Sequence, residues 1–198
     1  MMARRATSVA PKKAAYEPRH WRFNAEQYQL MGQVGIFHKE DRVELLRGEI
    51  YEMTPIGSWH GGGVDSLNMN FAGNLSGRAI VRVQGSFRIA MHSEPQPDLL
   101  VLKYRADYYK NALPGPEDVL LLVEVAETSL RYDREFKLPL YADANVSEVW
   151  IINHPEQRLE VYREPREGRY QSVSVHERGS VVASLAFPDL TVAVDDIL

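Results

Sequence analysis

The chain has 198 residues, a formal net charge of −4 and no cysteine. The lack of cysteine excludes disulfides, thiolate zinc sites and cysteine nucleophiles, and it is typical of the reducing cytoplasm, where we expect the protein. The negative charge argues against unselective binding of nucleic acid over the whole surface, but it leaves room for a local basic groove. No apolar run approaches the ~18 residues of a membrane span.

The N-terminal segment is basic. Residues 1–20 carry five lysines and arginines against one acid, Glu17, and they contain no apolar signal-peptide core. We predict a disordered solvated tail over these residues, with an organelle transit peptide or a DNA-contacting arm as alternatives. Residues 21–198 are predicted to form a single domain.

A helix and a hairpin are the first predicted elements. Asn24 is a suitable N-cap for a helix over residues 25–34, which Gly35 would end. Residues 43–53 (VELLRGEIYEM) predict a β-hairpin that turns at Arg47-Gly48. The apolar stripe of the helix is expected to consist of Tyr28, Leu30, Met31 and Val34.

A second helix and three strands follow. The helix is expected to begin at Ser58 or at the glycines after His60, and Gly77 would end it. Its apolar side is expected to hold Val64, Leu67, Met69, Phe71 and Leu75. The predicted strands cover residues 80–91, 97–103 and 119–126. The last of these, VLLLVEVA, is nearly all apolar, as expected for a central strand covered on both faces.

The last third of the chain is rich in strands. Residues 133–144 predict a helix with Phe136, Leu140 and Tyr141 facing inward, and Pro139 is expected to kink or shorten it. Strands are predicted over residues 148–153 (EVWIIN), 158–163, 170–175 and within the last twenty residues. This order of elements predicts an α/β or α+β fold in which helices flank a mixed sheet.

Glu124 is the most informative residue, because it stands inside the apolar run VLLLVEV. A lone carboxylate buried there would be very costly. One interpretation is a side chain on an edge strand that faces solvent. The other is a buried acid whose charge is compensated by a metal ion or a lysine, which makes it a candidate functional group.

Asp98 and Lys137 are the next candidates. Asp98 starts a strand that should lie beside that of Glu124. Two adjacent strands can hold two carboxylates about 5 Å apart. Mg²⁺ prefers oxygen ligands, which two such carboxylates would supply. Lys137 follows Asp133 by one helical turn, so the two could form an ordinary surface ion pair. Lys137 could instead reach the end of the Glu124 strand and stabilise charge on a phosphate oxygen.

Three segments, in this order and spacing, carry a resemblance to a known family. They are PQPDLLVL (95–102), LLVEV (121–125) and DREFKLPLY (133–141). Together with VELLRGEIYEM, His60 and NVSEVWIIN, they resemble the PD-(D/E)XK nuclease superfamily and, within it, the bacterial Uma-type restriction endonuclease family, a former domain of unknown function. The resemblance runs from about Phe23 to the C-terminus. It implies a restriction-endonuclease-like αβββαβ core with a β-rich C-terminal extension.

The resemblance also implies roles for individual residues. Asp98, Glu124 and the carbonyl of Val125 would bind one or two Mg²⁺ or Mn²⁺ ions and support hydrolysis of phosphodiester bonds in DNA. The superfamily usually places its lysine two residues after the second acid, where this chain has Ala126. In Uma-type proteins the lysine is on the following helix, and Lys137 fits that placement.

Glu44 and His60 match positions that the family places near the site. Glu44 is expected to be an extra metal or water ligand, and His60 to orient a ligand or contact phosphate, unless it only caps or packs its helix. Cleavage of duplex DNA would also suit a homodimer. Two other interpretations remain: a DNA-binding or scaffold protein that keeps the fold without cleaving, and an all-β sugar- or ligand-binding barrel, which requires residues 133–144 to be non-helical.

Overall fold

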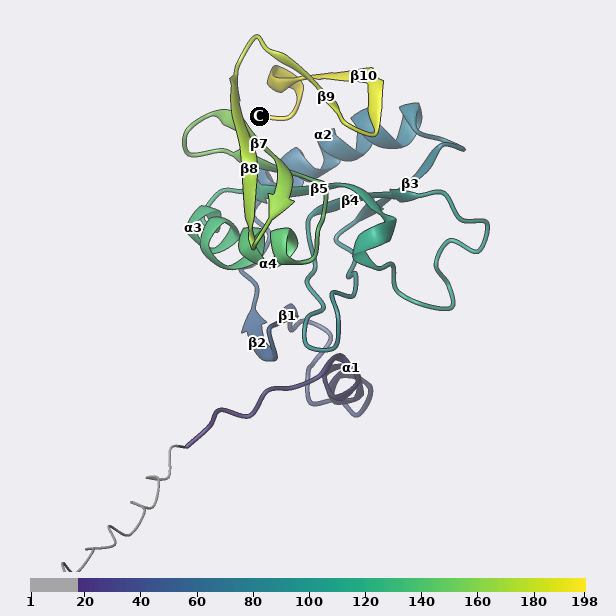
Figure 1. Ribbon diagram of the computed structural model, residues 1–198, viewed down its shortest axis with the longest axis vertical. Coiled ribbons are helices and arrows are strands. Elements are labelled where there is room, and N and C mark those ends of the chain that lie inside the picture. The colour runs from purple at the N-terminus through teal and green to yellow at the C-terminus, as the bar shows by residue number, and fades with distance from the viewer. Residues whose placement is uncertain (1–17) are drawn as a thin grey trace, which may run out of the picture.

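The computed structural model describes residues 18–198, so that the predicted N-terminal tail lies almost wholly outside the described residues (Figure 1). Its centre is a six-stranded sheet in the order β3-β4-β5-β6-β7-β8. β5 and β6 are parallel, and all other neighbours in this sheet are antiparallel. The strands are β3 (Ala79–Val83), β4 (Leu99–Lys103), β5 (Val119–Ala126), β6 (Glu148–Asn153), β7 (Arg158–Arg166) and β8 (Arg169–Glu177). This mixed sheet confirms the predicted fold class.

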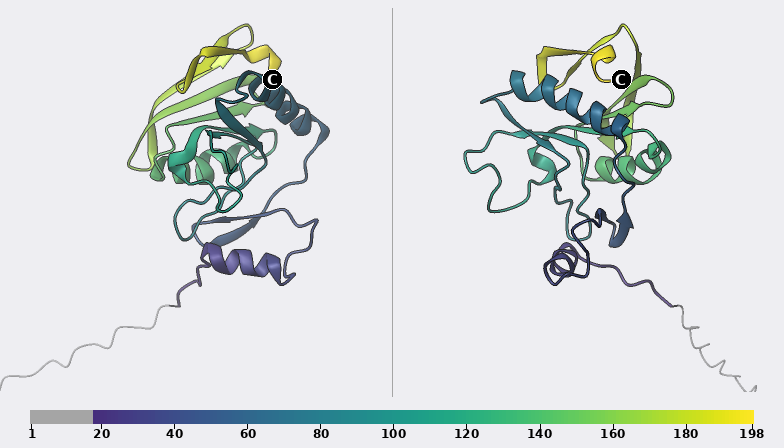
Figure 2. Two further views of the ribbon diagram at one scale, coloured as in Figure 1. Left: turned by 90° about the vertical axis from the view of Figure 1, so that its right-hand side faces the viewer. Right: turned by 180° about the vertical axis from the view of Figure 1, so that it is seen from behind.

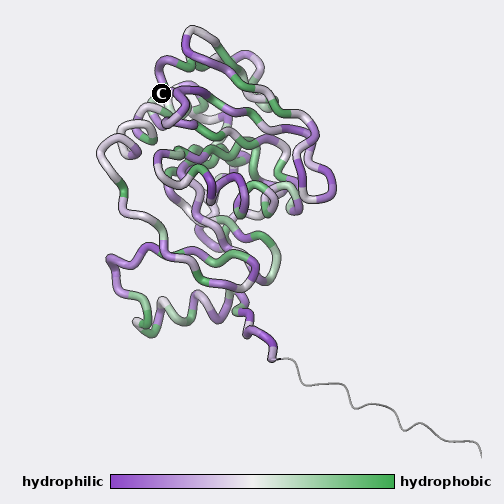
Figure 3. The backbone as a smooth tube through the Cα atoms, turned by 90° about the vertical axis from the view of Figure 1, so that its left-hand side faces the viewer, coloured by the Kyte–Doolittle hydropathy of each residue, from purple (hydrophilic) through white to green (hydrophobic). Residues whose placement is uncertain are grey.

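Helices cover both faces of the sheet (Figure 2). α2 (Ser58–Asn74) packs on one face, together with the hairpin of β9 (Val181–Ser184) and β10 (Phe187–Ala193). The other face is covered by three consecutive helical segments: α3 (Leu130–Tyr132), η2 (Asp133–Lys137) and α4 (Leu138–Asp143). Two short 3₁₀ turns, η1 (Pro116–Asp118) and η3 (Val194–Asp196), complete the elements of the described chain after residue 57. Figure 3 shows hydrophobic segments gathered in the central strands.

The first elements lie on the side of the sheet that also carries α3 and α4 (Figure 1). They are α1 (Ala25–Gln33) and the antiparallel pair β1 (Val43–Leu46) and β2 (Glu49–Glu52). The predicted hairpin is confirmed, and its turn residues Arg47 and Gly48 have φ angles of 51° and 84°, as a two-residue turn of this twist requires. The predicted N-cap is also confirmed, because Asn24 Oδ1 accepts the Gln27 N–H at 2.8 Å.

The predicted apolar stripe of α1 is wrong for Leu30 and Val34, while Tyr28 and Met31 are half-buried. Ala25 is the buried residue of this helix, whereas Leu30 and the following Val34 are 55% and 64% exposed. Hydrogen bonds attach the helix instead: the Ala25 N–H donates to Met91 O at 2.8 Å, and the Tyr28 hydroxyl donates to Val43 O at 2.7 Å. The attachment of α1 is therefore mainly polar.

Two further predictions need correction. The strand predicted over residues 80–91 ends at Val83, because the backbone turns at Gln84, whose φ is 46°. Met69, predicted on the apolar side of α2, is 78% exposed, while the other four residues assigned to that side are buried. Among residues 18–198, no helix combines the length and the apolar character needed to cross a membrane.

Candidate active site

Asp98 and Glu124 lie side by side at one end of the sheet. The pairing of Leu99 with Val123 between β4 and β5, extended by one residue, sets Asp98 opposite Glu124. The side chain of Glu124 points toward the α4 face, where its Oε1 accepts the hydroxyl of Tyr141 at 2.6 Å. Asp98 is 6% exposed and Glu124 is 2% exposed. The alternative of a solvent-facing Glu124 on an edge strand is therefore wrong.

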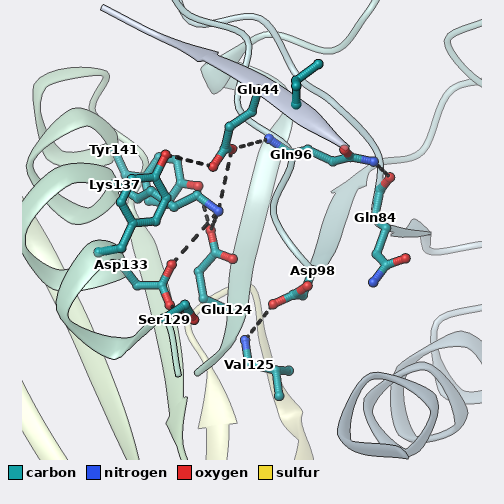
Figure 4. Close-up of polar contacts among 12 residues, drawn as sticks. Glu44, Gln84, Gln96, Asp98, Glu124, Val125, Ser129, Asp133, Lys137 and Tyr141 are labelled. Atoms are coloured by element: carbon teal, nitrogen blue, oxygen red, sulfur yellow. Dashed lines mark hydrogen bonds and ion pairs between the residues drawn. The ribbon is translucent and has the colours of Figure 1, made fainter. Parts of the chain in front are cut away.

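Lys137 compensates the buried charge of Glu124 (Figure 4). Its Nζ atom lies 2.9 Å from Glu124 Oε1, 3.6 Å from Glu44 Oε2 and 4.0 Å from Asp133 Oδ1. The lysine side chain is only 4% exposed. Lys137 and Asp133 are thus not a surface ion pair but members of a buried cluster of three acids around one lysine.

Glu44 brings the N-terminal hairpin into this cluster. Its Oε1 accepts the Tyr132 hydroxyl at 3.0 Å, and its Oε2 accepts the Gln96 N–H at 3.0 Å. Glu44 is 1% exposed although it belongs to a short two-stranded sheet outside the main one. Glu44 thus lines the same pocket as Asp98, Glu124 and Lys137.

Asp98 joins α2 to the sheet. Its Oδ2 accepts the backbone N–H of Val125 at 2.8 Å, and its Oδ1 lies 2.8 Å from His60 Nε2. The hydrogen bond with Asp98 is the main cause that raises the pKa of His60, against the opposing effect of burial. Gly63 allows this approach, because a Cβ atom there would lie 3.2 Å from Val125 Cγ1. His60 therefore contacts a site acid rather than only capping its helix.

The cluster carries an excess of acid. Burial, followed by the repulsion of Asp133 and Asp98, raises the pKa of Glu124 against the attraction of Lys137. Burial also raises the pKa of Asp133. Burial lowers the pKa of Lys137, but the surrounding carboxylates outweigh it and raise the pKa well above its usual value. One ammonium group thus faces several carboxylates, and the cluster favours additional positive charge, as a proton or as a cation.

A pocket of about 280 Å³ gives access to the cluster. It lies between the hairpin and the α3–η2 segment, and its lining includes the five predicted catalytic residues, Asp98, Glu124, Lys137, Glu44 and His60. A larger pocket of about 600 Å³ lies elsewhere, next to the start of α1, and contains none of them. The smaller pocket is therefore the candidate active site, because it contains the predicted catalytic side chains.

Several residues of the site were missed or misjudged from the sequence. Tyr141 was predicted only as an apolar helix residue, and Tyr132 and Gln96 were not singled out. The spacing of four from Lys137 to Tyr141 could have indicated a shared helix face. Phe136, predicted to face inward, is 49% exposed. η2 is a π-helical turn, and its larger number of residues per turn changes which side chains face the sheet.

The carboxylate oxygens of Asp98 and Glu124 are chemically suited to bind a hard divalent cation. Within residues 18–198, no three His, Cys, Asp or Glu side chains form a ready metal-ligand group. Mg²⁺, however, commonly takes only one or two protein carboxylates and keeps several waters. Asp98 and Glu124 can supply these. The N–H of Val125 points to Asp98. Because the N–H and the carbonyl of a strand residue point to the same side, the carbonyl of Val125 also faces Asp98.

The helical segments after β5 also exclude the all-β barrel, since α3, η2 and α4 occupy residues 130–143.

Comparisons with known proteins agree with this fold. The model of the Uma2 family, described as putative restriction endonuclease, matches residues 25–195. Among solved structures, a putative nuclease belonging to DUF820 from Anabaena variabilis ATCC 29413 is similar, with a TM-score of 0.63 and 16% identity over 83% of this chain and 94% of that chain. At this identity the likeness concerns the fold. No curated protein matches the chain.

Proposed function

The chain belongs to the Uma2 putative restriction endonuclease family, and we therefore propose that it is a metal-dependent endonuclease that hydrolyses phosphodiester bonds in DNA. The observation that carries the proposal is the contact of Lys137 with Glu124 opposite Asp98, inside a pocket open to a substrate. Two buried acids and a lysine at one end of a sheet can hold a cation and stabilise a charged phosphate together.

Asp98, Glu124 and the carbonyl of Val125 would hold Mg²⁺ or Mn²⁺. Such an ion, when bound, lowers the pKa of a coordinated water and so supplies a nucleophile at neutral pH. Lys137 keeps its proton because its carboxylate neighbours raise its pKa. Its ammonium group can therefore offset the negative charge that accumulates on the phosphate oxygens during attack.

Glu44, His60 and Tyr141 position these groups. Glu44 lies 3.6 Å from Lys137 Nζ and limits the directions in which the lysine can point. His60 holds Asp98 Oδ1 at 2.8 Å, which suits the predicted role of orienting a ligand. Tyr141 holds Glu124 Oε1 at 2.6 Å and leaves Oε2 for a further partner. Each contact fixes one carboxylate or the lysine, as an active site requires.

The test is cleavage of a panel of supercoiled plasmid, linear duplex, single-stranded DNA and RNA with Mg²⁺ or Mn²⁺. Glu124→Gln removes the charge of the central acid and keeps its shape. Glu52→Gln is the matched control, because Glu52 is an exposed acid that lines the same pocket. We expect the wild type and Glu52→Gln to cut, and Glu124→Gln to be inactive while its circular dichroism stays native.

Cutting by Glu124→Gln at the wild-type rate would contradict the assigned site. Metal binding in calorimetry without cleavage of any substrate would instead support a DNA-binding or scaffold protein that keeps the nuclease fold.

A further inference from the structure

A second feature with the chemistry of a binding site is the loop that follows β4. We call residues 103–110 (KYRADYYK) the tyrosine loop. It belongs to the long connection that projects beside the sheet on the right of Figure 1. It begins at the end of β4 opposite Asp98, and the five residue steps between them correspond to about 17 Å. The loop is thus separate from the pocket of the candidate active site, whose lining includes no residue of the loop.

The loop has a buried anchor. The ring of Tyr109 is 5% exposed, and its hydroxyl donates to Lys103 O at 2.9 Å. The guanidinium groups of Arg105 and Arg82 lie 4.4 Å and 5.5 Å from the centre of this ring. Arg82 Nη2 also donates to Tyr108 O at 3.3 Å. These contacts hold the loop against the sheet edge formed by β3.

The same loop displays two aromatic rings to solvent. Tyr104 and Tyr108 are 48% and 53% exposed, and their rings lie 6.2 Å apart in an edge-to-face arrangement. Tyr108 and Tyr109 both have positive φ angles, 52° and 57°, which are unusual for bulky residues. Strained residues of this kind persist where the surrounding structure holds them, commonly at ligand-binding segments. The strain turns Tyr108 outward while Tyr109 points inward.

Two lysines of the loop lie close to the exposed tyrosines in the sequence. Lys103 and Lys110 are exposed, and within residues 18–198 neither is paired with a carboxylate. Arg105, in contrast, is neutralised by Asp107 at 2.8 Å. The exposed part of the loop thus combines two half-exposed aromatic rings with two positive charges. Single-stranded nucleic acid has the complementary chemistry, because its bases stack on aromatic rings and its phosphates attract lysine.

We propose that the tyrosine loop binds single-stranded nucleic acid, with bases stacked on Tyr104 and Tyr108 and phosphates near Lys103 and Lys110. The choice of nucleic acid as the ligand rests partly on the proposed function. Duplex DNA keeps its bases stacked inside and cannot use the two rings in this way. The loop would therefore engage an unpaired strand at a distance from the reacting phosphate.

The test is fluorescence anisotropy with a labelled oligothymidylate and with a duplex of equal length, both in EDTA so that cleavage plays no part. Tyr104→Ala and Tyr108→Asn remove the rings, and Asn tolerates the left-handed backbone at residue 108. Tyr104→Phe and Tyr108→Phe are the matched controls. We expect each ring removal to weaken oligothymidylate binding at least about fivefold. The Phe variants should bind like the wild type, and duplex binding should not change in any of them.

The lysines give an independent readout. Lys103→Ala and Lys110→Ala should each reduce the slope of log affinity against log salt by about 0.7 for the single strand. Unchanged binding after ring removal, equal losses for duplex and single strand, or no binding of oligothymidylate by the wild type would each overturn the proposal.

The two proposals can fail separately. If the wild type cleaves DNA but the ring variants keep full affinity, the tyrosine loop is refuted and the endonuclease stands. If the rings are needed for binding but no substrate is cut, the endonuclease proposal is refuted and the tyrosine loop stands as a binding site.

Discussion

Lys137 Nζ lies 2.9 Å from Glu124 Oε1, and the two side chains are only 4% and 3% exposed. A buried ion pair of this kind balances a large desolvation cost against its mutual attraction. Glu44 and Asp133 add further negative charge within 4.0 Å of the lysine. Lys137 is therefore needed for the stability of the fold as well as for the proposed reaction.

Removal of Lys137 should leave buried acids without their cation. For Lys137→Met in metal-free buffer at neutral pH, we expect the free energy of unfolding to fall by about 3–5 kcal/mol. Urea denaturation measures it. Lys39→Met, at an exposed lysine, is the control and should change stability by less than about 0.5 kcal/mol. Adding Glu124→Gln to Lys137→Met should restore part of the loss, and a double variant no more stable than the single one would contradict this account.

The hydroxyl of Tyr141 donates to the same oxygen of Glu124 that contacts Lys137. Because hydrogen bonds to charged groups are the stronger ones, Tyr141→Phe should lower the free energy of unfolding by about 1.5–3 kcal/mol. Tyr51→Phe removes a comparable hydroxyl, which bonds to Glu49 at 2.7 Å in a more exposed setting. That variant should be nearly neutral in thermal unfolding. Equal effects of the two substitutions would show that burial of Glu124 adds nothing.

Glu160 on β7 provides a test by pH. Burial would raise its pKa, but hydrogen bonds from Arg134, Tyr162 and Asn153 outweigh it and lower the pKa to about 2. A depressed carboxyl pKa stabilises the fold above the unfolded value of about 4.5, and this contribution is lost as pH falls toward about 2. Glu160→Gln should therefore cost on the order of 2–3 kcal/mol near pH 7.

Urea denaturation at a series of pH values should show the difference between the wild type and Glu160→Gln shrinking as pH falls below 4.5 and most of it lost by about pH 2. A difference that stays constant over this range would mean that the charge of Glu160 is not its source.

Two neighbouring glycines of α2 should respond differently to the same substitution. A Cβ at Gly63 would lie 3.2 Å from Val125 Cγ1, whereas nothing lies within 4 Å of one at Gly62. Gly63→Val should therefore push α2 away from β5, cost about 1–3 kcal/mol and weaken the contact of His60 with Asp98. Gly62→Val should leave thermal stability almost unchanged. The assignment of a close approach at Gly63 fails if the two variants melt at the same temperature.

The parts of the fold that depend on local pattern were predictable. Residues 119–126 and 148–153 form strands with the predicted bounds, because long apolar runs are hard to place anywhere but in a covered central strand. The end of β3 was not predictable, since the positive φ of Gln84 leaves no clear mark in the sequence. The alternation of apolar and polar residues that predicted a strand to residue 91 continues in the sequence past Gln84, where the backbone turns.

In the candidate site, too, some residues were predictable from local sequence and others were not. Glu124 was recognisable as an acid inside an apolar run, and Lys137 through the spacing of its segment. The contact of Glu44 with Lys137 joins residues 93 positions apart and depends on how the hairpin docks, so no local pattern predicts it. Tyr141 was missed as a hydrogen-bond donor because apolar spacing shows that a tyrosine is buried but not where its hydroxyl points.

The π-helical turn at η2 has a consequence for tracing this site through evolution. The N–H of Leu138 donates to the carbonyl of Asp133, five residues back, so the turn holds one residue more than an α-helix would. In a relative that lacks the extra residue, the counterparts of Asp133 and Lys137 would both align with this chain only if the alignment has a one-residue gap between them. Alignments that forbid a gap within a helix would then mismatch Asp133 or Lys137. Searches for distant homologues should therefore permit a single insertion at this turn.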